Sequence, residues 1–119
     1  MKAIEVISVP VTDQQAAKEF YLKIGFQLIV EAPMGNNQTW VQVGLPDQTT
    51  SLTLVNWFPK MQPGSMQGLV VLTNDIEKEV EELRAKGVEV GNIDDTPWGR
   101  FAWFNDPDGN SLTLRGENK

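Results

Sequence analysis

The sequence contains no cysteine and no histidine. Without cysteine the chain has no disulfide, no thiolate metal ligand and no thiol nucleophile. Without histidine it lacks the commonest metal ligand and the side chain that most often transfers protons near neutral pH. A serine nucleophile would also lack its usual base. We therefore predict no catalytic residue of these common types.

Basic residues are also scarce, and long hydrophobic runs are missing. Ten Lys and Arg stand against sixteen Asp and Glu, which gives a net charge of -6. A negative chain repels the phosphate backbone, so nucleic acid is not an expected partner. No apolar run reaches the ~18 residues that suggest a membrane span, and no signal peptide is recognisable. We expect a cytoplasmic protein that does not bind membranes.

The 119 residues favour one domain, 1–119, built from an internal repeat. Two predicted helices begin at capping-box pairs, Thr12 with Gln15 and Asn74 with Glu77, and end at Gly25 and Gly87. Corresponding positions in the two helices lie 62 residues apart. The tetrapeptide SLTL occurs at 51–54 and again at 111–114, each time shortly after Pro-Asp. The first module covers about 1–58 and the second about 66–116.

Around each helix the alternation of apolar residues predicts four strands. They cover 2–11, 26–30, 39–44 and 51–55 in the first module, and 68–73, 88–90, 100–104 and 111–114 in the second, with loops at 34–37 and 94–99. Each module thus reads strand, helix, strand, strand, strand, an α+β architecture. Each sheet can bury one face under its helix, and the two sheets can together enclose a cavity.

The segment FNDPDGN at 104–110 predicts a tight turn before the last strand. Its acidic residues, with Glu117, resemble a calcium-binding loop, but the glycine stands at the fourth position of that loop and not at the sixth. We interpret Asp106 as a residue whose side chain bonds amides of its own turn. Tyr21, the single tyrosine, falls on the apolar stripe of the first helix and is interpreted as a core residue.

Several segments together resemble the vicinal oxygen chelate superfamily, which includes glyoxalase I, fosfomycin-resistance proteins, extradiol dioxygenases and bleomycin-resistance binding proteins. They are ISVPVTD, FYLKIGF, LTNDIEKEVEELRAKGV and PWGRFAWFNDPDGNSLTL. The resemblance implies two tandem βαβββ modules that form a cupped mixed sheet with a concave cavity. It also implies four metal ligands, at the positions that here hold Val6, Thr53, Gly68 and Thr113. None of these is a good ligand for a divalent cation, so we expect no metal and no cofactor.

Strand alternation predicts which side chains face the cavity. They are Val6, Ser8, Ser51, Thr53, Gly68, Val70, Ser111 and Thr113, while Ile7, Val9, Leu52, Leu54, Leu69, Val71, Leu112 and Leu114 should lie under the helices. The candidate ligand-binding residues are Ser8, Trp40, Thr53, Trp57, Phe58, Trp98, Arg100, Trp103 and Thr113. Trp40 and Trp103 fit ordinary packing equally well. Arg100 could bond a ligand or pair with Asp94 or Asp95.

Three functions are compatible with these features. The favoured one is a metal-independent protein of the bleomycin-resistance type that binds a small planar or cationic organic ligand, to sequester a drug or metabolite in the groove of a homodimer. The second is a lyase-like or dioxygenase-like enzyme with non-standard metal ligands. The third is a subunit whose tryptophans form a protein interface.

Overall fold

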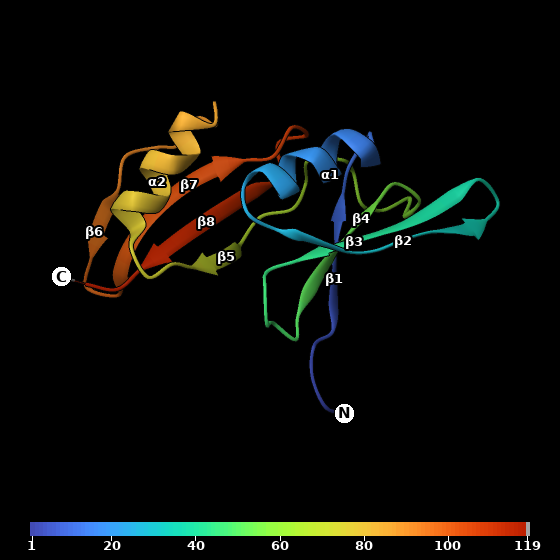
Figure 1. Cartoon of the computed structure of the whole chain (residues 1–119), viewed down its shortest axis with the longest axis horizontal. Coiled ribbons are helices and arrows are strands. Elements are labelled where there is room, and N and C mark those ends of the chain that lie inside the picture. The colour runs from blue at the N-terminus through green and yellow to red at the C-terminus, as the bar shows by residue number, and fades with distance from the viewer. Residues whose placement is uncertain (119) are drawn as a thin grey trace.

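The computed structural model describes residues 1–118 and shows two modules of the predicted βαβββ order (Figure 1). The first module contains β1 (Val6–Pro10), α1 (Gln14–Lys23), β2 (Gln27–Gly35), β3 (Gln38–Gly44) and β4 (Ser51–Val55). The second contains β5 (Leu69–Leu72), α2 (Ile76–Ala85), β6 (Asp94–Thr96), β7 (Gly99–Asn105) and β8 (Ser111–Gly116). No helix in this part of the chain is long and apolar enough to cross a membrane.

Each module forms its own four-stranded mixed sheet, and the two sheets share one topology. Sheet A has the order β1-β4-β3-β2 and sheet B the order β5-β8-β7-β6. In each, the first strand pairs in parallel with the last, and the remaining pairs are antiparallel. Each sheet has its helix on one face, which we call the inner face, and the opposite face is the outer face. The predicted α+β class with tandem βαβββ modules is confirmed.

The predicted helix caps are wrong by one residue. Asp13 is the N-cap of α1 and accepts hydrogen bonds from the N–H groups of Gln15 and Ala16 at 3.0 and 3.1 Å. Asp75 is the N-cap of α2. A carboxylate in this position bonds the free N–H groups and also carries a charge opposite to that of the helix start. The two caps are still 62 residues apart, so the repeat is unaffected.

The strand predicted at 88–90 is also wrong, and the edge strand of sheet B lies further on, within the predicted loop at 94–99. The N–H of Val88 bonds the carbonyl of Leu83 and so closes the end of α2. Between Val88 and β6, the N–H of Gly91 bonds the carbonyl of Trp103 in β7 at 3.0 Å. A single backbone bond is not a strand pairing, and regular antiparallel pairing with β7 begins at Asp94.

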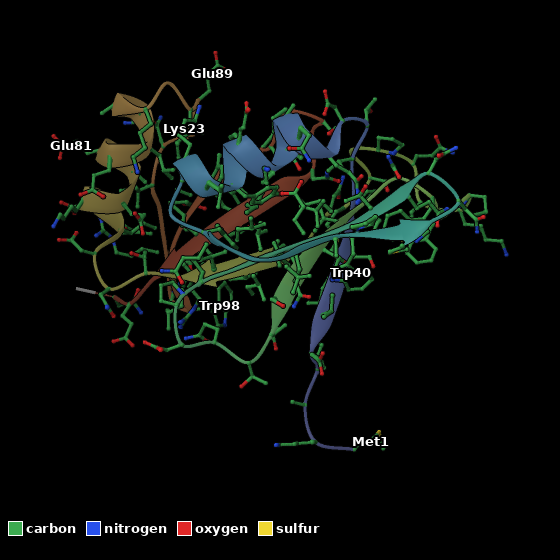
Figure 2. The ribbon with its side chains drawn as sticks, turned by 45° about the vertical axis from the view of Figure 1, so that its right-hand side comes forward. Met1, Lys23, Trp40, Glu81, Glu89 and Trp98 are labelled. Carbon is green, nitrogen blue, oxygen red and sulfur yellow. The ribbon has the colours of Figure 1, made fainter. Side chains whose placement is uncertain are left out.

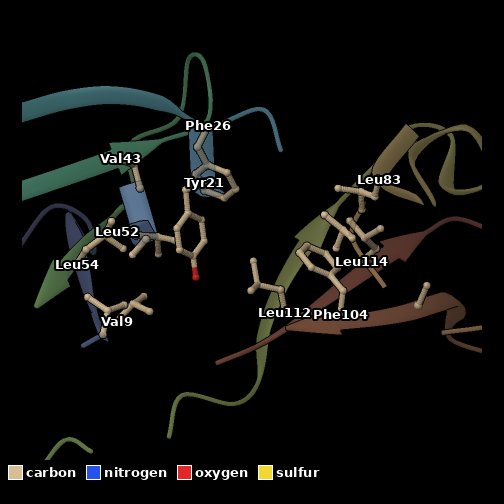
Figure 3. Close-up of a cluster of buried hydrophobic side chains, with 14 of the residues drawn as sticks. Val9, Tyr21, Phe26, Val43, Leu52, Leu54, Leu83, Phe104, Leu112 and Leu114 are labelled. Carbon is tan, nitrogen blue, oxygen red and sulfur yellow. The ribbon is translucent and has the colours of Figure 1, made fainter. Parts of the chain in front are cut away.

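The inner faces of both sheets contribute to one hydrophobic core. The eight residues predicted to lie under the helices all belong to it or pack against it. Tyr21 of α1 is completely buried. Figure 3 shows it between side chains of the first module, such as Val9 and Leu52, and Leu112 and Phe104 of the second. The prediction that Tyr21 is a core residue is confirmed.

The turn between β7 and β8 joins the two modules. One carboxylate oxygen of Asp106 accepts from the N–H groups of Asp108 and Asn110, both at 2.9 Å, as predicted. The other accepts from the hydroxyl of Tyr21 at 2.9 Å and from the side-chain amide of Asn110 at 2.8 Å. That amide also donates to the carbonyl of Pro10 at 2.8 Å. The same turn therefore bonds α1 and the end of β1.

Candidate functional site

Three aromatic rings gather beside the outer face of sheet A, and we call them the aromatic cluster. Trp40 lies in β3, and Trp57 and Phe58 follow β4. The rings of Trp40 and Trp57 are 6.5 Å apart and tilted by 32°, and those of Trp57 and Phe58 are 5.9 Å apart. Trp40 and Trp57 are half-buried, and Phe58 is 45% exposed. Rings held in this way offer a surface on which a planar molecule can stack.

A row of uncharged polar side chains runs across the same face. The strand register aligns Ser8 with Thr53, and Thr53 with Gln42. The hydroxyls of Ser8 and Thr53 are 3.4 Å apart. Thr53 is completely buried and is out of reach of a ligand. Ser8 and Gln42 are only half-buried, so they are the polar side chains that a ligand on this face could contact.

Gln42 connects the polar row to the aromatic cluster. Its side-chain oxygen accepts a hydrogen bond from Nε1 of Trp40 at 3.0 Å, and its side-chain nitrogen donates to the hydroxyl of Ser51 at 2.6 Å. Gln42 was not among the predicted site residues. The sequence could have indicated Gln42, because in a strand the residue two positions after Trp40 lies on the same face of the sheet.

The outer face of sheet B also exposes apolar side chains. One row holds Val70, Thr113 and Trp103, and the next holds Leu72, Arg115 and Phe101. The rings of Phe101 and Trp103 stack at 6.2 Å. Val70, Leu72 and Trp103 are 53%, 61% and 45% exposed, whereas Thr113 is buried. This face therefore leaves a large apolar surface uncovered by the chain itself.

Trp98 and Arg100 do not join either row. Trp98 lies between β6 and β7, is 75% exposed, and accepts a bond from Arg115 through its carbonyl. Arg100 belongs to the inner side of sheet B, where it pairs with Asp95 at 2.6 Å and Glu77 of α2 at 3.0 Å. The bond to Asp95, and secondarily that to Glu77, raises the pKa of the guanidinium. Of the two sequence-based alternatives for Arg100, the structure has the pairing with Asp95.

The predicted site residues thus fall into two groups on different sheets. Ser8, Trp40, Thr53, Trp57 and Phe58 gather on sheet A, and Trp103 and Thr113 lie on sheet B. Within residues 1–118, no strand of one sheet makes a close backbone contact with a strand of the other. Figure 2 shows Trp40 and Trp98 on the opposite side of the sheets from Lys23, Glu81 and Glu89.

A groove of about 710 Å³ lies elsewhere, on the helix side of the junction between the modules. It is lined by Phe20 and Lys23 of α1, by 87–91, and by 103–107. No residue of the aromatic cluster lines this groove.

The four positions at which the resemblance implied metal ligands do not fit a metal. Val6 and Gly68 have no donor atom in their side chains. The hydroxyl of Thr53 is buried against Ser8, and Thr113 is only 8% exposed. No group of three Asp or Glu residues gathers as a cation site in the part of the chain that the structure describes. These four positions offer no ligand set for a divalent cation.

Comparisons with known proteins agree with the geometry. The family model described as Glyoxalase/Bleomycin resistance protein/Dioxygenase superfamily matches residues 3–114. The uncharacterized protein YetH of Bacillus subtilis (strain 168) is 36% identical over 97% of this chain and 98% of its own length.

Two solved structures from Streptomyces sp. CB03234 are similar throughout. TnmS3, an antibiotic binding protein, has 43% identity and a TM-score of 0.94 over 99% of this chain and 98% of its own. A glyoxalase/bleomycin resistance protein has 46% identity and a TM-score of 0.84 over 92% and 96%. With a family model matched over nearly its whole length and relatives this similar, the chain belongs to the glyoxalase/bleomycin resistance protein/dioxygenase superfamily.

Proposed function

We propose that this protein binds a small planar organic molecule, an antibiotic or a metabolite, and sequesters it without a metal ion. The observation that carries the proposal is the aromatic cluster beside an uncharged polar row on a sheet face that no helix covers. The similarity to TnmS3, an antibiotic binding protein, supports the same class of function. Stacking supplies affinity and the polar row supplies orientation.

The residues at the four expected ligand positions support the proposed metal independence. A divalent cation needs oxygen, nitrogen or thiolate donors that converge within about 2–2.6 Å of one point. Val6 and Gly68 contribute none, and the two threonines contribute only neutral hydroxyls. Binding by this face therefore rests on side-chain contacts with the ligand alone.

We also propose that the binding unit is a homodimer. Val70, Leu72 and Trp103 expose a contiguous apolar face on sheet B, and such faces are usually covered by a partner. A second copy that placed its sheet A opposite this face would surround a ligand with aromatic groups from both sheets. Introducing a charge on this face with Leu72→Glu is expected to convert the dimer to a monomer in sedimentation experiments. A wild-type protein that sediments as a monomer would contradict the dimer proposal alone.

Calorimetric titration of chelator-treated protein tests ligand binding. The probes are acridone, a neutral three-ring molecule, and 9-aminoacridine, its cationic counterpart. Binding of either probe by the metal-free protein is expected to weaken at least about tenfold in Trp57→Ala, because one stacking surface is lost. Trp98→Ala is the comparison variant, since Trp98 lies outside the aromatic cluster. Binding that requires added metal, or turnover of a probe on metal addition, would contradict the proposed function.

A further inference from the structure

The outer face of sheet A carries no charged side chain in its strands. The residues that the register places there are Val6, Ser8, Pro10, Gln27, Val30, Ala32, Gln38, Trp40, Gln42, Gly44, Ser51, Thr53 and Val55. The charged residue of β2, Glu31, is on the inner side, where it bonds Lys18 and Gln15 of α1. A ligand on the outer face would therefore meet hydrogen-bonding groups and rings, but no counter-ion from these strands.

The absence of a counter-ion on this face favours neutral ligands over cationic ones. Rings attract cations, but the attraction is weaker than the cost of removing an ammonium group from water without a carboxylate to receive it. The net charge of -6 attracts cations to the whole surface, but salt screens that attraction. A neutral ligand needs only satisfied hydrogen bonds on burial.

The amide of Gln42 is oriented to make such a bond. Nε1 of Trp40 can only donate, so the group of Gln42 facing it at 3.0 Å must be the oxygen. The amide nitrogen then faces the hydroxyl of Ser51 at 2.6 Å. Trp40 uses one lone pair of the Gln42 oxygen, and Ser51 uses one N–H of its NH₂ group. The half-buried amide therefore keeps one N–H and one lone pair for a ligand beside the aromatic cluster.

We propose that Gln42 is the specificity-determining residue of this face and that it selects uncharged planar ligands with a hydrogen-bonding edge, such as a ring carbonyl. The inference rests on the proposed function. Because two neighbours already fix the amide, a ligand stacked on the cluster would form the new bond with little further ordering. A cation of the same shape would gain no compensating charge.

The test compares acridone with 9-aminoacridine by calorimetry at about 0.5 M salt, where attraction to the overall charge is screened. The wild-type protein is expected to bind acridone at least about tenfold more tightly. Gln42→Leu should weaken acridone binding about tenfold through loss of the hydrogen bond. Gln42→Glu, which has nearly the same shape, should reverse the preference towards 9-aminoacridine. Gln67→Leu, at an exposed position before β5, is the matched control.

The outcomes separate the inference from the proposed function. Tighter binding of 9-aminoacridine by the wild type, or acridone binding unchanged in Gln42→Leu, overturns the role of Gln42 while ligand binding stands. If neither probe binds the wild type, the proposed function fails and the inference fails with it. Circular dichroism verifies that each variant is folded. If Gln42→Leu does not fold, the reversal in Gln42→Glu decides, and an unreversed preference overturns the inference.

Discussion

The hydroxyl of Tyr21 donates a 2.9 Å hydrogen bond to the carboxylate of Asp106, which lies 85 residues later in the chain. Both residues are buried, and the bond joins the helix of the first module to the turn of the second. Asn110 adds a second connection through the carbonyl of Pro10. Since strands of the two sheets make no close backbone contact within the described chain, these bonds and the shared core fix how the modules are oriented.

Tyr21→Phe removes this bond and little else, since the ring remains. We expect the free energy of unfolding to fall by about 1.5–3 kcal/mol, the usual range for a buried hydrogen bond to a charged group. Urea denaturation monitored by tryptophan fluorescence measures the change. A loss below about 0.5 kcal/mol would mean that the bond contributes little to holding the modules together.

Asp106→Asn should destabilise the protein more than Tyr21→Phe. The carboxylate accepts four hydrogen bonds, two at each oxygen. An asparagine amide that places its NH₂ group at the Oδ2 position can donate to the Tyr21 hydroxyl, but the side-chain NH₂ of Asn110 then loses its acceptor, and no remaining bond is made to a charged group. We expect a loss of more than about 3 kcal/mol in the same urea experiment. A double-mutant cycle with Tyr21→Phe then isolates the coupling between the two side chains, and strictly additive losses would contradict direct coupling.

The protonation of Tyr21 gives a separate test by pH. Burial, followed by the nearby Asp106 charge and its hydrogen bond, raises the pKa of this phenol above its ordinary value of about 10. A raised pKa in the folded state means that the stabilisation is complete below about pH 10 and is lost progressively above it. Because Tyr21 is the only tyrosine, absorbance at about 295 nm reports it alone.

In the folded protein we expect no tyrosinate signal at pH 10–11, while protein unfolded in urea should titrate near its ordinary pKa of about 10. If the folded protein titrates in that same range, the phenol is accessible and the buried bond is absent. Tyr21→Phe should lack the signal in both states and should lose less stability above about pH 10 than the wild type.

The features that depend on nearby residues could be predicted from the sequence. The glycines at 25 and 87, the repeated SLTL and the alternation within strands gave the order of elements and the residues under the helices. The caps were missed because Thr12 and Asp13 are both good capping residues, and only the three-dimensional structure shows which side chain reaches the N–H groups. The edge strand of sheet B was missed because Val88 and Val90 are apolar for packing beneath α2, not for pairing.

The candidate site was harder to predict, because its geometry depends on residues far apart in sequence. Alternation could identify Ser8 and Thr53 as neighbours, but not that Thr53 would be completely buried. The approach of Trp57 to Trp40 depends on how the chain after β4 turns back, which no local pattern specifies. The sequence offered Asp94 and Asp95 as partners of Arg100, and the structure pairs it with Asp95 and with Glu77, which α2 brings close from elsewhere in the chain.

Gly64 tests how closely the linker packs on the turn that joins the modules. Its φ is +84°, and an added Cβ would lie far inside van der Waals contact with the backbone carbonyl oxygen of Asp108. Gly35 has almost the same φ, +86°, with nothing within 4 Å of its Cβ position. Gly35→Ala therefore carries only the conformational strain, about 1–2 kcal/mol. Gly64→Ala adds a clash with backbone that cannot rotate away, so we expect a loss of more than about 3 kcal/mol. Urea denaturation of the two variants measures both, and equal losses would contradict close packing of the linker against the turn.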